Sequence, residues 1–345
     1  MNNGDIITAI DQWEARRKEI IENAVELEFG GIPPKPDAVF VEPLVELGSG
    51  RVNSYRVHCK IKEFDFTFCI NINMPKSDRK VPLVICGDSI YDTCNDKVIA
   101  EANRRGFAVA KFNRTEFAPD LFNSERTSGI YPIFPDLMFS AISAWAWGYM
   151  RVVDAVLTLD YIDAANIAIA GHSRGGKTVL LAAALDERIR FVNPNGSGTH
   201  GCGCYRFEQR EQPGLYEDER SETLADLFGA VPYWMGQEMK QYIGRENEIP
   251  HDMHFIKALV APRVLIETNG YADIWANPRG SYITNIEAKK VWALYGKEKN
   301  CLAHYREGGH NHTFEDFCVL FDIMEAVISG NEPVEYPNPF PDIEL

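Results

Sequence analysis

The chain has 345 residues, 45% of them hydrophobic, which is enough for one large α/β domain or two small ones. Its formal net charge of −15, without a long Lys/Arg cluster, argues against a nucleic-acid partner because an acidic surface repels phosphate backbones. The charged first twenty residues hold no apolar signal segment, and no apolar stretch is long enough for a membrane span, so we expect a cytoplasmic, non-membrane protein with eight reduced cysteines.

The N-terminal part of the sequence predicts a helix and then a β-hairpin. Residues 5–28 are expected to form a helix that ends before the Gly/Pro-rich stretch "FGGIPPKP". The segments "SYRVHCK" and "FDFTFCINI" alternate apolar and polar residues on either side of "IKE". Alternation with a period of two around a short connection is typical of two antiparallel strands.

Short apolar runs, most of them separated by helical stretches, follow the hairpin. These runs cover residues 81–87, 106–112, 166–171, 189–195 and 263–269. They are typical of strands that are buried on both faces of a mostly parallel sheet. Helices are expected from 136, with Asp136 as the cap, to about 159, and at 175–185, 281–296 and 313–329. The alternation predicts an open, doubly wound α/β sheet within a single domain that covers residues 1–345.

Two segments interrupt this alternation. Residues 205–250 carry many charges together with Tyr233, Trp234 and Tyr242, and we expect a helical insertion that lies over the carboxyl edge of the sheet as a lid. Whether its aromatic side chains serve a lid or only the insertion's own core is left open. Residues 330–345 contain four prolines and are expected to wrap the surface as a tail.

The segment "GHSRGGKT", residues 171–178, satisfies two unrelated patterns. As G-x-S-x-G it is a nucleophile elbow with Ser173 at its tip, and as G-x-x-x-x-G-K-[ST] it is a phosphate-binding loop with Lys177 and Thr178. Both patterns need a strand before and a helix after. A phosphate-binding loop also needs a Mg²⁺-holding acid at the end of a second strand, for which Glu267 is only a rough candidate. The context favours the elbow.

The elbow predicts an acid and then a histidine further along the chain, and both are present in that order. Asp273 follows the apolar run 263–269, and His310 lies in a Gly-rich loop before the last expected helix. A serine hydroxyl becomes nucleophilic when an imidazole takes its proton, and a carboxylate orients the imidazole. Glu267 and His312 are the competing candidates for the acid and the base. The pattern predicts a three-layer α/β-hydrolase fold and a serine esterase.

Five segments in collinear order resemble the glucuronoyl esterases, carbohydrate esterases that split the 4-O-methylglucuronate esters linking xylan to lignin. The segment "GHSRGGK" is similar to that family's G-C-S-R-x-G-K motif, with His172 in place of cysteine. The other four are "NGSGTHGCGCYR", "HDMHFIKALVAPRVLIETN", "ADIWANPRG" and "EGGHNHTFEDF". The resemblance covers about residues 80–320.

The resemblance implies a role for each matching residue. Ser173 would be the nucleophile, His310 the base, and Arg174 a cation that stabilises the oxyanion. Lys177 would bind sugar hydroxyls and Trp275 would pack against the sugar. The catalytic glutamate that many members carry falls on Gly196 here, so the acid is expected at the family's other position, which is Asp273.

The sequence thus predicts a serine carboxylic-ester hydrolase that acts on a small carbohydrate ester, most simply a glucuronoyl ester, through an acyl-enzyme. No cofactor or metal is expected, because His200, Cys202 and Cys204 lack a fourth ligand and the usual zinc spacing. Two alternatives remain: a sugar O-acetyl esterase like the acetyl xylan esterases, and a degenerate homologue that only binds sugars. The oligomeric state is not predicted.

Overall fold

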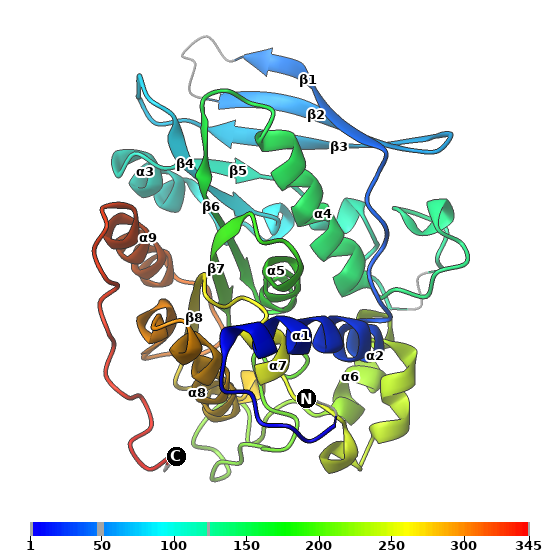
Figure 1. Ribbon diagram of the computed structural model, residues 1–345, viewed down its shortest axis with the longest axis vertical. Helices are drawn as coiled ribbons and strands as arrows, with labels where there is room; N and C mark the ends of the chain where they lie inside the picture. Colours follow the sequence, from blue (N-terminus) through cyan, green and yellow to red (C-terminus); the bar gives the residue numbers. More distant parts are fainter. Residues whose placement is uncertain (1–2, 47–51, 123–124, 344–345) are drawn as a thin grey trace.

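A mixed β-sheet organises the computed structural model, which describes residues 3–46, 52–122 and 125–343 (Figure 1). The described residues form nine strands in the order β1-β2-β3-β5-β4-β6-β7-β8-β9. Their bounds are β1 Ala38–Glu46, β2 Val52–Ile61, β3 Phe64–Asn73, β4 Val81–Cys86, β5 Ala108–Lys111, β6 Ile162–His172, β7 Ile189–Asn195, β8 Val264–Gly270 and β9 Cys301–Arg306. Strands β4 to β9 are parallel, and β1 to β3 form an antiparallel extension that joins β5.

The predicted hairpin and the predicted mostly parallel sheet are confirmed, but the edge strand β1 was not anticipated. Pro43 lies within β1, and the register shifts between Pro43 and Val45. A proline lacks the N–H that a ladder needs, so it argues against a central strand and is tolerated at an edge. β1 pairs with β2 alone, which is why the strand tolerates Pro43.

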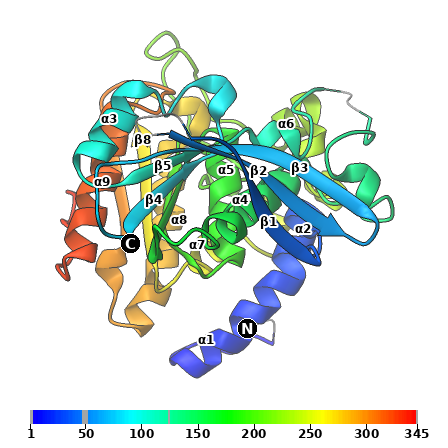
Figure 2. The ribbon, with the colours of Figure 1, turned by 90° about the horizontal axis from the view of Figure 1, so that it is seen from above.

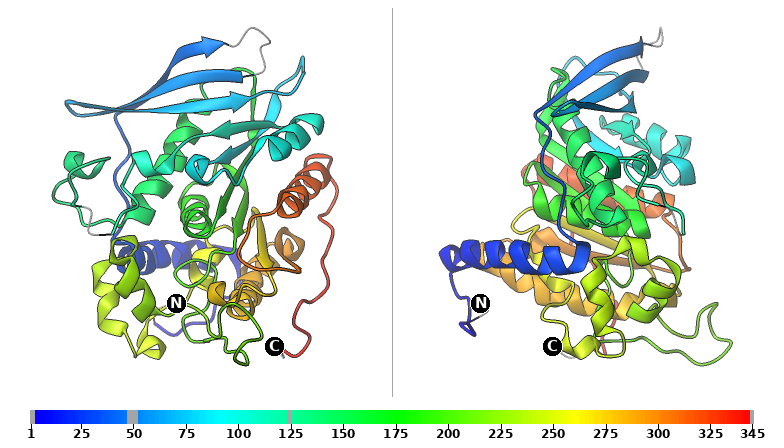
Figure 3. Two further views of the ribbon diagram at one scale, coloured as in Figure 1. Left: turned by 180° about the vertical axis from the view of Figure 1, so that it is seen from behind. Right: turned by 90° about the vertical axis from the view of Figure 1, so that its right-hand side faces the viewer.

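Helices cover both faces of the sheet and give three layers (Figures 1 and 3). One face carries α4 (Ala141–Val156), α5 (Arg174–Leu185), α7 (His254–Ala258) and α8 (Pro278–Leu294). The other face carries α3 (Asp96–Arg104) and α9 (Phe314–Ile328). The parallel strands bury apolar residues on both sides, which explains their continuous apolar runs.

The helix predicted for residues 5–28 begins at Ile10. It consists of α1 (Ile10–Ile20), one π-helical turn (Ile21–Val25) and α2 (Glu26–Phe29). α1 projects away from the sheet when the molecule is seen from above (Figure 2). The N-terminal segment nevertheless joins the core through Trp13, Ile20 and Phe29, which are all buried.

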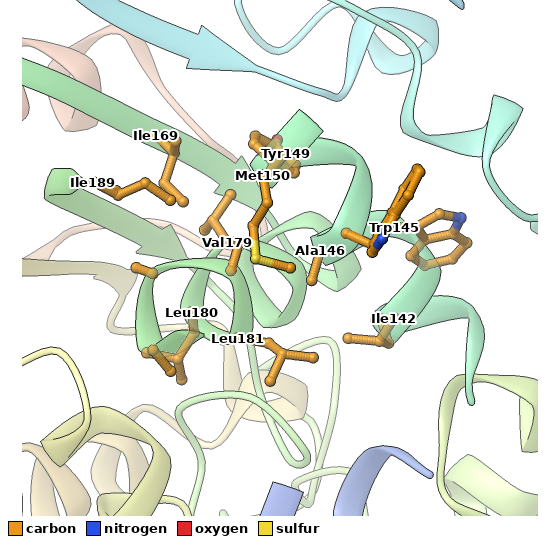
Figure 4. Close-up of a cluster of buried hydrophobic side chains, with 14 of the residues drawn as sticks. Ile142, Trp145, Ala146, Tyr149, Met150, Ile169, Val179, Leu180, Leu181 and Ile189 are labelled. Carbon is orange, nitrogen blue, oxygen red and sulfur yellow. The ribbon is translucent and has the colours of Figure 1, made fainter. Parts of the chain in front are cut away.

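The central core lies between α4, α5 and the sheet (Figure 4). Side chains from α4 and α5, including Met150 and Val179, pack near Ile169 of β6 and Ile189 of β7, and Trp145 and Leu181 belong to the same cluster. α4 is buried on nearly all sides, which accounts for the long apolar stretch in its sequence. No helix of the described ranges is long and apolar enough to cross a bilayer.

The cap predicted for the long apolar helix was wrong. α4 begins at Ala141, and the Oγ atom of Ser140 accepts the backbone N–H of Ser143 at 3.2 Å. Asp136 lies four residues before Ser140 and outside the helix. Serine and aspartate are both good N-caps, so the pattern alone did not separate them.

The segment 205–250 contains one short α-helix and several 3₁₀ turns. These are α6 (Leu224–Ala230) and the turns Pro232–Trp234, Gln237–Tyr242 and Glu246–Glu248. The C-terminal tail follows α9 down one side of the molecule (Figure 1). Its Phe340 packs against the rings of Tyr271, Tyr282 and Tyr305, which holds the tail against the body.

A buried charge ties α2 to the loop that follows β7. The Glu28 carboxylate is fully buried and binds Nδ1 of His200 at 2.5 Å, Nε2 of His251 at 2.7 Å and the hydroxyl of Tyr205. Burial alone would raise the pKa of Glu28, but the two histidines outweigh burial and hold this pKa far below its ordinary value of 4.5. His200 is therefore a hydrogen-bonded core residue.

Glu28→Gln is expected to lower the free energy of unfolding by about 3 kcal/mol, because it removes the charge that the buried histidines face. Since the folded-state pKa is depressed, the stabilisation by Glu28 is present above pH 4.5 and declines progressively as the pH falls from that value toward the folded-state pKa. Urea unfolding at pH 7 and at pH 3 measures both effects. The exposed neighbour Glu26 provides the matched control, since Glu26→Gln should leave the unfolding midpoint unchanged; an equal loss in both variants would contradict this account.

Candidate active site

Ser173 occupies a strained turn between β6 and α5. Its φ of 55° and ψ of −118° lie outside the regions that L-residues usually adopt, as expected for a nucleophile elbow. The turn requires glycine on either side. A Cβ at Gly171 would lie 2.3 Å from the carbonyl oxygen of Gly175, and a Cβ at Gly175 would lie 2.2 Å from Oδ2 of Asp88.

Asp88, two residues after the end of β4, holds this turn in place through its side chain. Its buried carboxylate accepts the backbone N–H of His172 at 3.0 Å and Nε of the buried Arg114 at 2.7 Å. The backbone N–H of Ser173 donates to the carbonyl of Asn195 in β7 at 2.8 Å. The serine is thus fixed to the strands on both sides of β6. Asp88 was not anticipated from the sequence, although an acid directly after the apolar run 81–87 is a usable signal.

Ser173, His310 and Asp273 form one hydrogen-bonded chain. Oγ of Ser173 lies 2.9 Å from Nε2 of His310, and Nδ1 of His310 lies 2.8 Å from Oδ2 of Asp273. Asp273 is 3% exposed, and its other oxygen accepts the backbone N–H of Ala276 at 3.3 Å. The His310 side chain is 39% exposed, so it can reach a substrate. The carboxylate holds Nδ1 protonated, which leaves the lone pair of Nε2 toward the serine.

The competing candidates lie in other environments. Glu267 is buried inside β8, where Nζ of Lys257 lies 2.5 Å from its Oε2 and Asn269 donates to its Oε1 at 3.0 Å. His312 is buried, stacks on Phe317 and bonds the Asn193 side chain at 3.2 Å. Burial, and then the nearby His172, hold the pKa of His312 well below its ordinary value. Neither residue contacts Ser173 or His310 through a hydrogen bond in the described structure.

Arg174, the first residue of α5, lies beside the serine in a cluster that includes the insertion. Its guanidinium bonds Oδ2 of Asp120 at 3.0 Å and lies 4.8 Å from the ring centroid of Trp234. Trp234 and Tyr233 both donate to Oδ1 of Asp120, at 3.2 and 2.9 Å. The aromatic side chains of the insertion therefore help to hold Arg174. The role of Asp120 was not predicted.

The charge balance around Asp120 keeps its carboxylate ionised. Burial alone would raise the pKa of Asp120, but the guanidinium groups of Arg114 and Arg174 outweigh burial and lower the pKa below its ordinary value. The Arg174 side chain remains 35% exposed. A fixed cation beside the nucleophile can stabilise negative charge that develops on a substrate oxygen.

Lys177 is buried in α5, at 3% exposure, and its ammonium contacts three protein acceptors. These are the carbonyls of Ser197, at 2.6 Å, and Thr199, and the carboxylate of Glu222 at 3.3 Å. An ammonium has three donors, so this arrangement uses all of them. No N–H donor of Lys177 is left to bind a phosphate, which argues against the phosphate-binding loop. Binding of a sugar hydroxyl by Lys177 stays a proposal, and it would require an exchange with one of these acceptors.

Trp275 follows Asp273 in a 3₁₀ turn (Ile274–Ala276) and is partly exposed. The carbonyl of Trp275 accepts the backbone N–H of Glu222. Trp275 therefore lies next to Glu222, whose carboxylate contacts Lys177. Gly196, the position where the resemblance implied a catalytic glutamate in many family members, also lies at the site. A Cβ built there would lie 3.1 Å from Oδ2 of Asp273 and 3.4 Å from Nδ1 of His310. Glycine at position 196 thus allows Asp273 to approach His310 closely.

Sequence comparisons find relatives of this chain among known proteins. The family model for fungal glucuronyl esterases matches residues 57–296. The chain is 29% identical over 318 residues to the 4-O-methyl-glucuronoyl methylesterase of Podospora anserina, covering 90% of this chain and 62% of the relative. It is 27% identical to that of Schizophyllum commune, covering 90% and 76%.

Solved structures support the fold. A carbohydrate esterase family 15 glucuronoyl esterase from Caldicellulosiruptor kristjansonii matches with a TM-score of 0.85 and 25% identity, covering 99% of this chain and 94% of that one. The predicted α/β-hydrolase fold is thereby confirmed. The chain spans about three fifths of the length of the Podospora relative. Because the family model matches well over half of its residues, the chain belongs to the glucuronyl esterase family.

Proposed function

We propose that the protein hydrolyses glucuronoyl esters through an acyl-enzyme on Ser173. The observation that carries this proposal is the unbroken hydrogen-bonded chain from Oγ of Ser173 through His310 to Asp273. An intact chain of this kind would have no purpose in a homologue that only binds sugars. The names of the relatives, 4-O-methyl-glucuronoyl methylesterases, support the choice of ester.

Each side chain has a task that follows from its position. As Oγ of Ser173 attacks the ester carbonyl, Nε2 of His310 takes the hydroxyl proton, and Asp273 stabilises the resulting imidazolium. Negative charge develops on the carbonyl oxygen, where Arg174 stabilises it together with backbone N–H groups at the start of α5. His310 then gives its proton to the leaving alcohol. Water releases the acid by the same steps in the second half of the reaction.

Arg174→Met is expected to lower kcat by about 10²-fold with a smaller change in KM, because the lost interaction is formed mainly in the transition state. The fold should persist, since Asp120 keeps the hydrogen bonds of Tyr233 and Trp234. Steady-state kinetics on a soluble ester measure the effect. A variant in which KM rises while kcat stays unchanged would show that Arg174 binds the ground state of the substrate and does not act on the oxyanion.

The choice of acyl group is tested by comparing methyl glucuronate with p-nitrophenyl acetate. We expect methanol release from methyl glucuronate with a kcat/KM that is lost in Ser173→Ala. Turnover of the acetate alone would favour the alternative sugar O-acetyl esterase. Turnover of neither ester by a folded protein would favour the degenerate sugar-binding homologue.

A further inference from the structure

The guanidinium of Arg174 is anchored to the protein through one of its N–H groups. Nη1 donates to Oδ2 of Asp120 at 3.0 Å, and among the described residues the guanidinium forms no other hydrogen bond. Arg174 lines a cavity of about 420 Å³ together with Ser173 and His310, where the reaction takes place. A guanidinium has five N–H donors, so those that Asp120 does not use remain available to a substrate oxygen in this cavity.

The carboxylate of Asp120 divides four hydrogen bonds between its two oxygens. Oδ1 accepts from the hydroxyl of Tyr233 at 2.9 Å and from Nε1 of Trp234 at 3.2 Å. Oδ2 accepts from Arg174 at 3.0 Å and from the hydroxyl of Tyr91 at 3.2 Å. A carboxylate has about four lone-pair sites, so all of them are used. The carboxylate cannot rotate without breaking bonds at both oxygens, and Oδ2 therefore stays turned toward Arg174.

A second arginine connects Asp120 to the turn that carries the nucleophile. Nη1 of the buried Arg114 lies 3.6 Å from Oδ2 of Asp120, and its Nε bonds Asp88 at 2.7 Å. Asp88 in turn accepts the backbone N–H of His172 at 3.0 Å. The charges alternate in sign along this row, which begins and ends at the turn because Arg174 follows the nucleophile directly. Arg174 is thus fixed to the turn through its backbone and also through its side chain.

On the basis of the proposed function, we propose that Asp120 is a positioning residue for the oxyanion and that the insertion takes part in catalysis through Tyr233 and Trp234. These two side chains orient the carboxylate, and the carboxylate orients the guanidinium of Arg174. The ring centroid of Trp234 also lies 4.8 Å from this guanidinium. A cation that is already oriented when the oxyanion forms stabilises the transition state without a cost of reorganisation. The insertion is then more than a lid with its own small core.

Two single substitutions measure the positioning effect with methyl glucuronate as the substrate. Asp120→Asn is expected to lower kcat about 30-fold with a smaller change in KM. The oxygen of the asparagine faces the two donors of the insertion, so its NH2 group faces Arg174, where two donors cannot bond. Tyr233→Phe removes one hydrogen bond at Oδ1 and should lower kcat about 3- to 5-fold.

Tyr242→Phe is the matched control. Tyr242 belongs to the same insertion and is also partly exposed, but its hydroxyl forms no hydrogen bond within the described structure. This variant should leave kcat unchanged. Thermal unfolding shows whether each variant is folded, and Tyr233→Phe alone decides the question if Asp120→Asn does not fold.

Repeating both substitutions in an Arg174→Met background separates positioning from a general loss of structure. If Asp120 and Tyr233 act through Arg174, each substitution should change kcat there by no more than about 2-fold, because the group that they orient is already missing. A general structural defect would instead lower kcat by the same factor in both backgrounds.

Three results would overturn the inference and leave the proposed function intact. They are equal losses in the two backgrounds, an unchanged kcat in both single variants, and a kcat that rises in Asp120→Asn. The last result would show that the ion pair restrains Arg174 away from the oxyanion. A folded wild-type protein that does not cleave methyl glucuronate would overturn the proposed function, and this inference with it.

Discussion

Replacing His310 with alanine is expected to lower kcat for glucuronoyl ester hydrolysis by about 10³-fold or more, because Ser173 loses the group that accepts its proton. KM should change far less, since His310 acts mainly on the reacting atoms. The imidazole is at the surface, with 39% of its side chain exposed, so the protein should remain folded. Steady-state kinetics with methyl glucuronate and a thermal unfolding curve measure the two properties separately.

His312 provides the matched control, because it is two residues away and was the competing candidate for the base. In His312→Gln the new side-chain amide can still donate to the oxygen of Asn193, which accepts from His312 at 3.2 Å. We expect kcat to stay within about 10-fold of the wild type and stability to fall modestly, as buried packing against Phe317 is lost. If His312→Gln were the variant that abolished turnover while His310→Ala retained it, the assignment of the base would be wrong.

Asp273→Asn is expected to lower kcat by about 10⁴-fold. The asparagine can still accept the backbone N–H of Ala276, as Asp273 does at 3.3 Å, so the local turn should persist. The NH2 group of the asparagine would face Nδ1 of His310, in place of the carboxylate oxygen that accepts the Nδ1 proton in the wild type. The imidazole then carries its proton on Nε2 and cannot accept one from Ser173. The kcat measurement should be accompanied by circular dichroism to show that the fold is retained.

Glu267→Gln separates catalysis from stability. The substitution breaks a buried ion pair in which Nζ of Lys257 lies 2.5 Å from Oε2 of Glu267. It is expected to lower the free energy of unfolding by about 3 kcal/mol. Below its melting temperature the variant should retain a kcat close to that of the wild type. The opposite pattern, with Glu267→Gln inactive and Asp273→Asn active, would assign the catalytic acid to the strand residue.

The sequence predicted the parallel strands well because each one is buried on both faces. The runs 81–87 and 189–195 correspond closely to β4 and β7. The antiparallel edge was harder to predict, since β1 contains Pro43 and its register shifts there. The start of α4 was misplaced because Asp136 and Ser140 are equally good caps, and only packing selects between them.

The candidate site was predictable to the extent that it depends on chain order and turn geometry. Ser173, Asp273 and His310 follow three different strands of one parallel sheet, and the carboxyl ends of such strands meet at the same edge. The partners of Arg174 could not be predicted in this way. Asp120 and Trp234 come from an irregular loop and from the insertion, and no periodicity connects them. The expected cytoplasmic location stays a prediction.

The burial of Lys177 was also beyond the sequence pattern. A lysine one helical turn after a nucleophile suggests a group that points into the pocket. The acceptors that surround it belong to loops far along the chain, including Glu222. Its role in substrate binding depends on whether an incoming hydroxyl can replace one of these acceptors.

Labelling by a fluorophosphonate probe tests the central claim most directly, because the probe reacts only with a serine that a neighbouring base has activated. Intact-protein mass spectrometry should find one adduct per chain in the wild type, and peptide mapping should place it on Ser173. The adduct should be absent in Ser173→Ala and strongly reduced in His310→Ala. A folded wild-type protein that takes up no label, or one whose labelling persists in Ser173→Ala, would contradict the account.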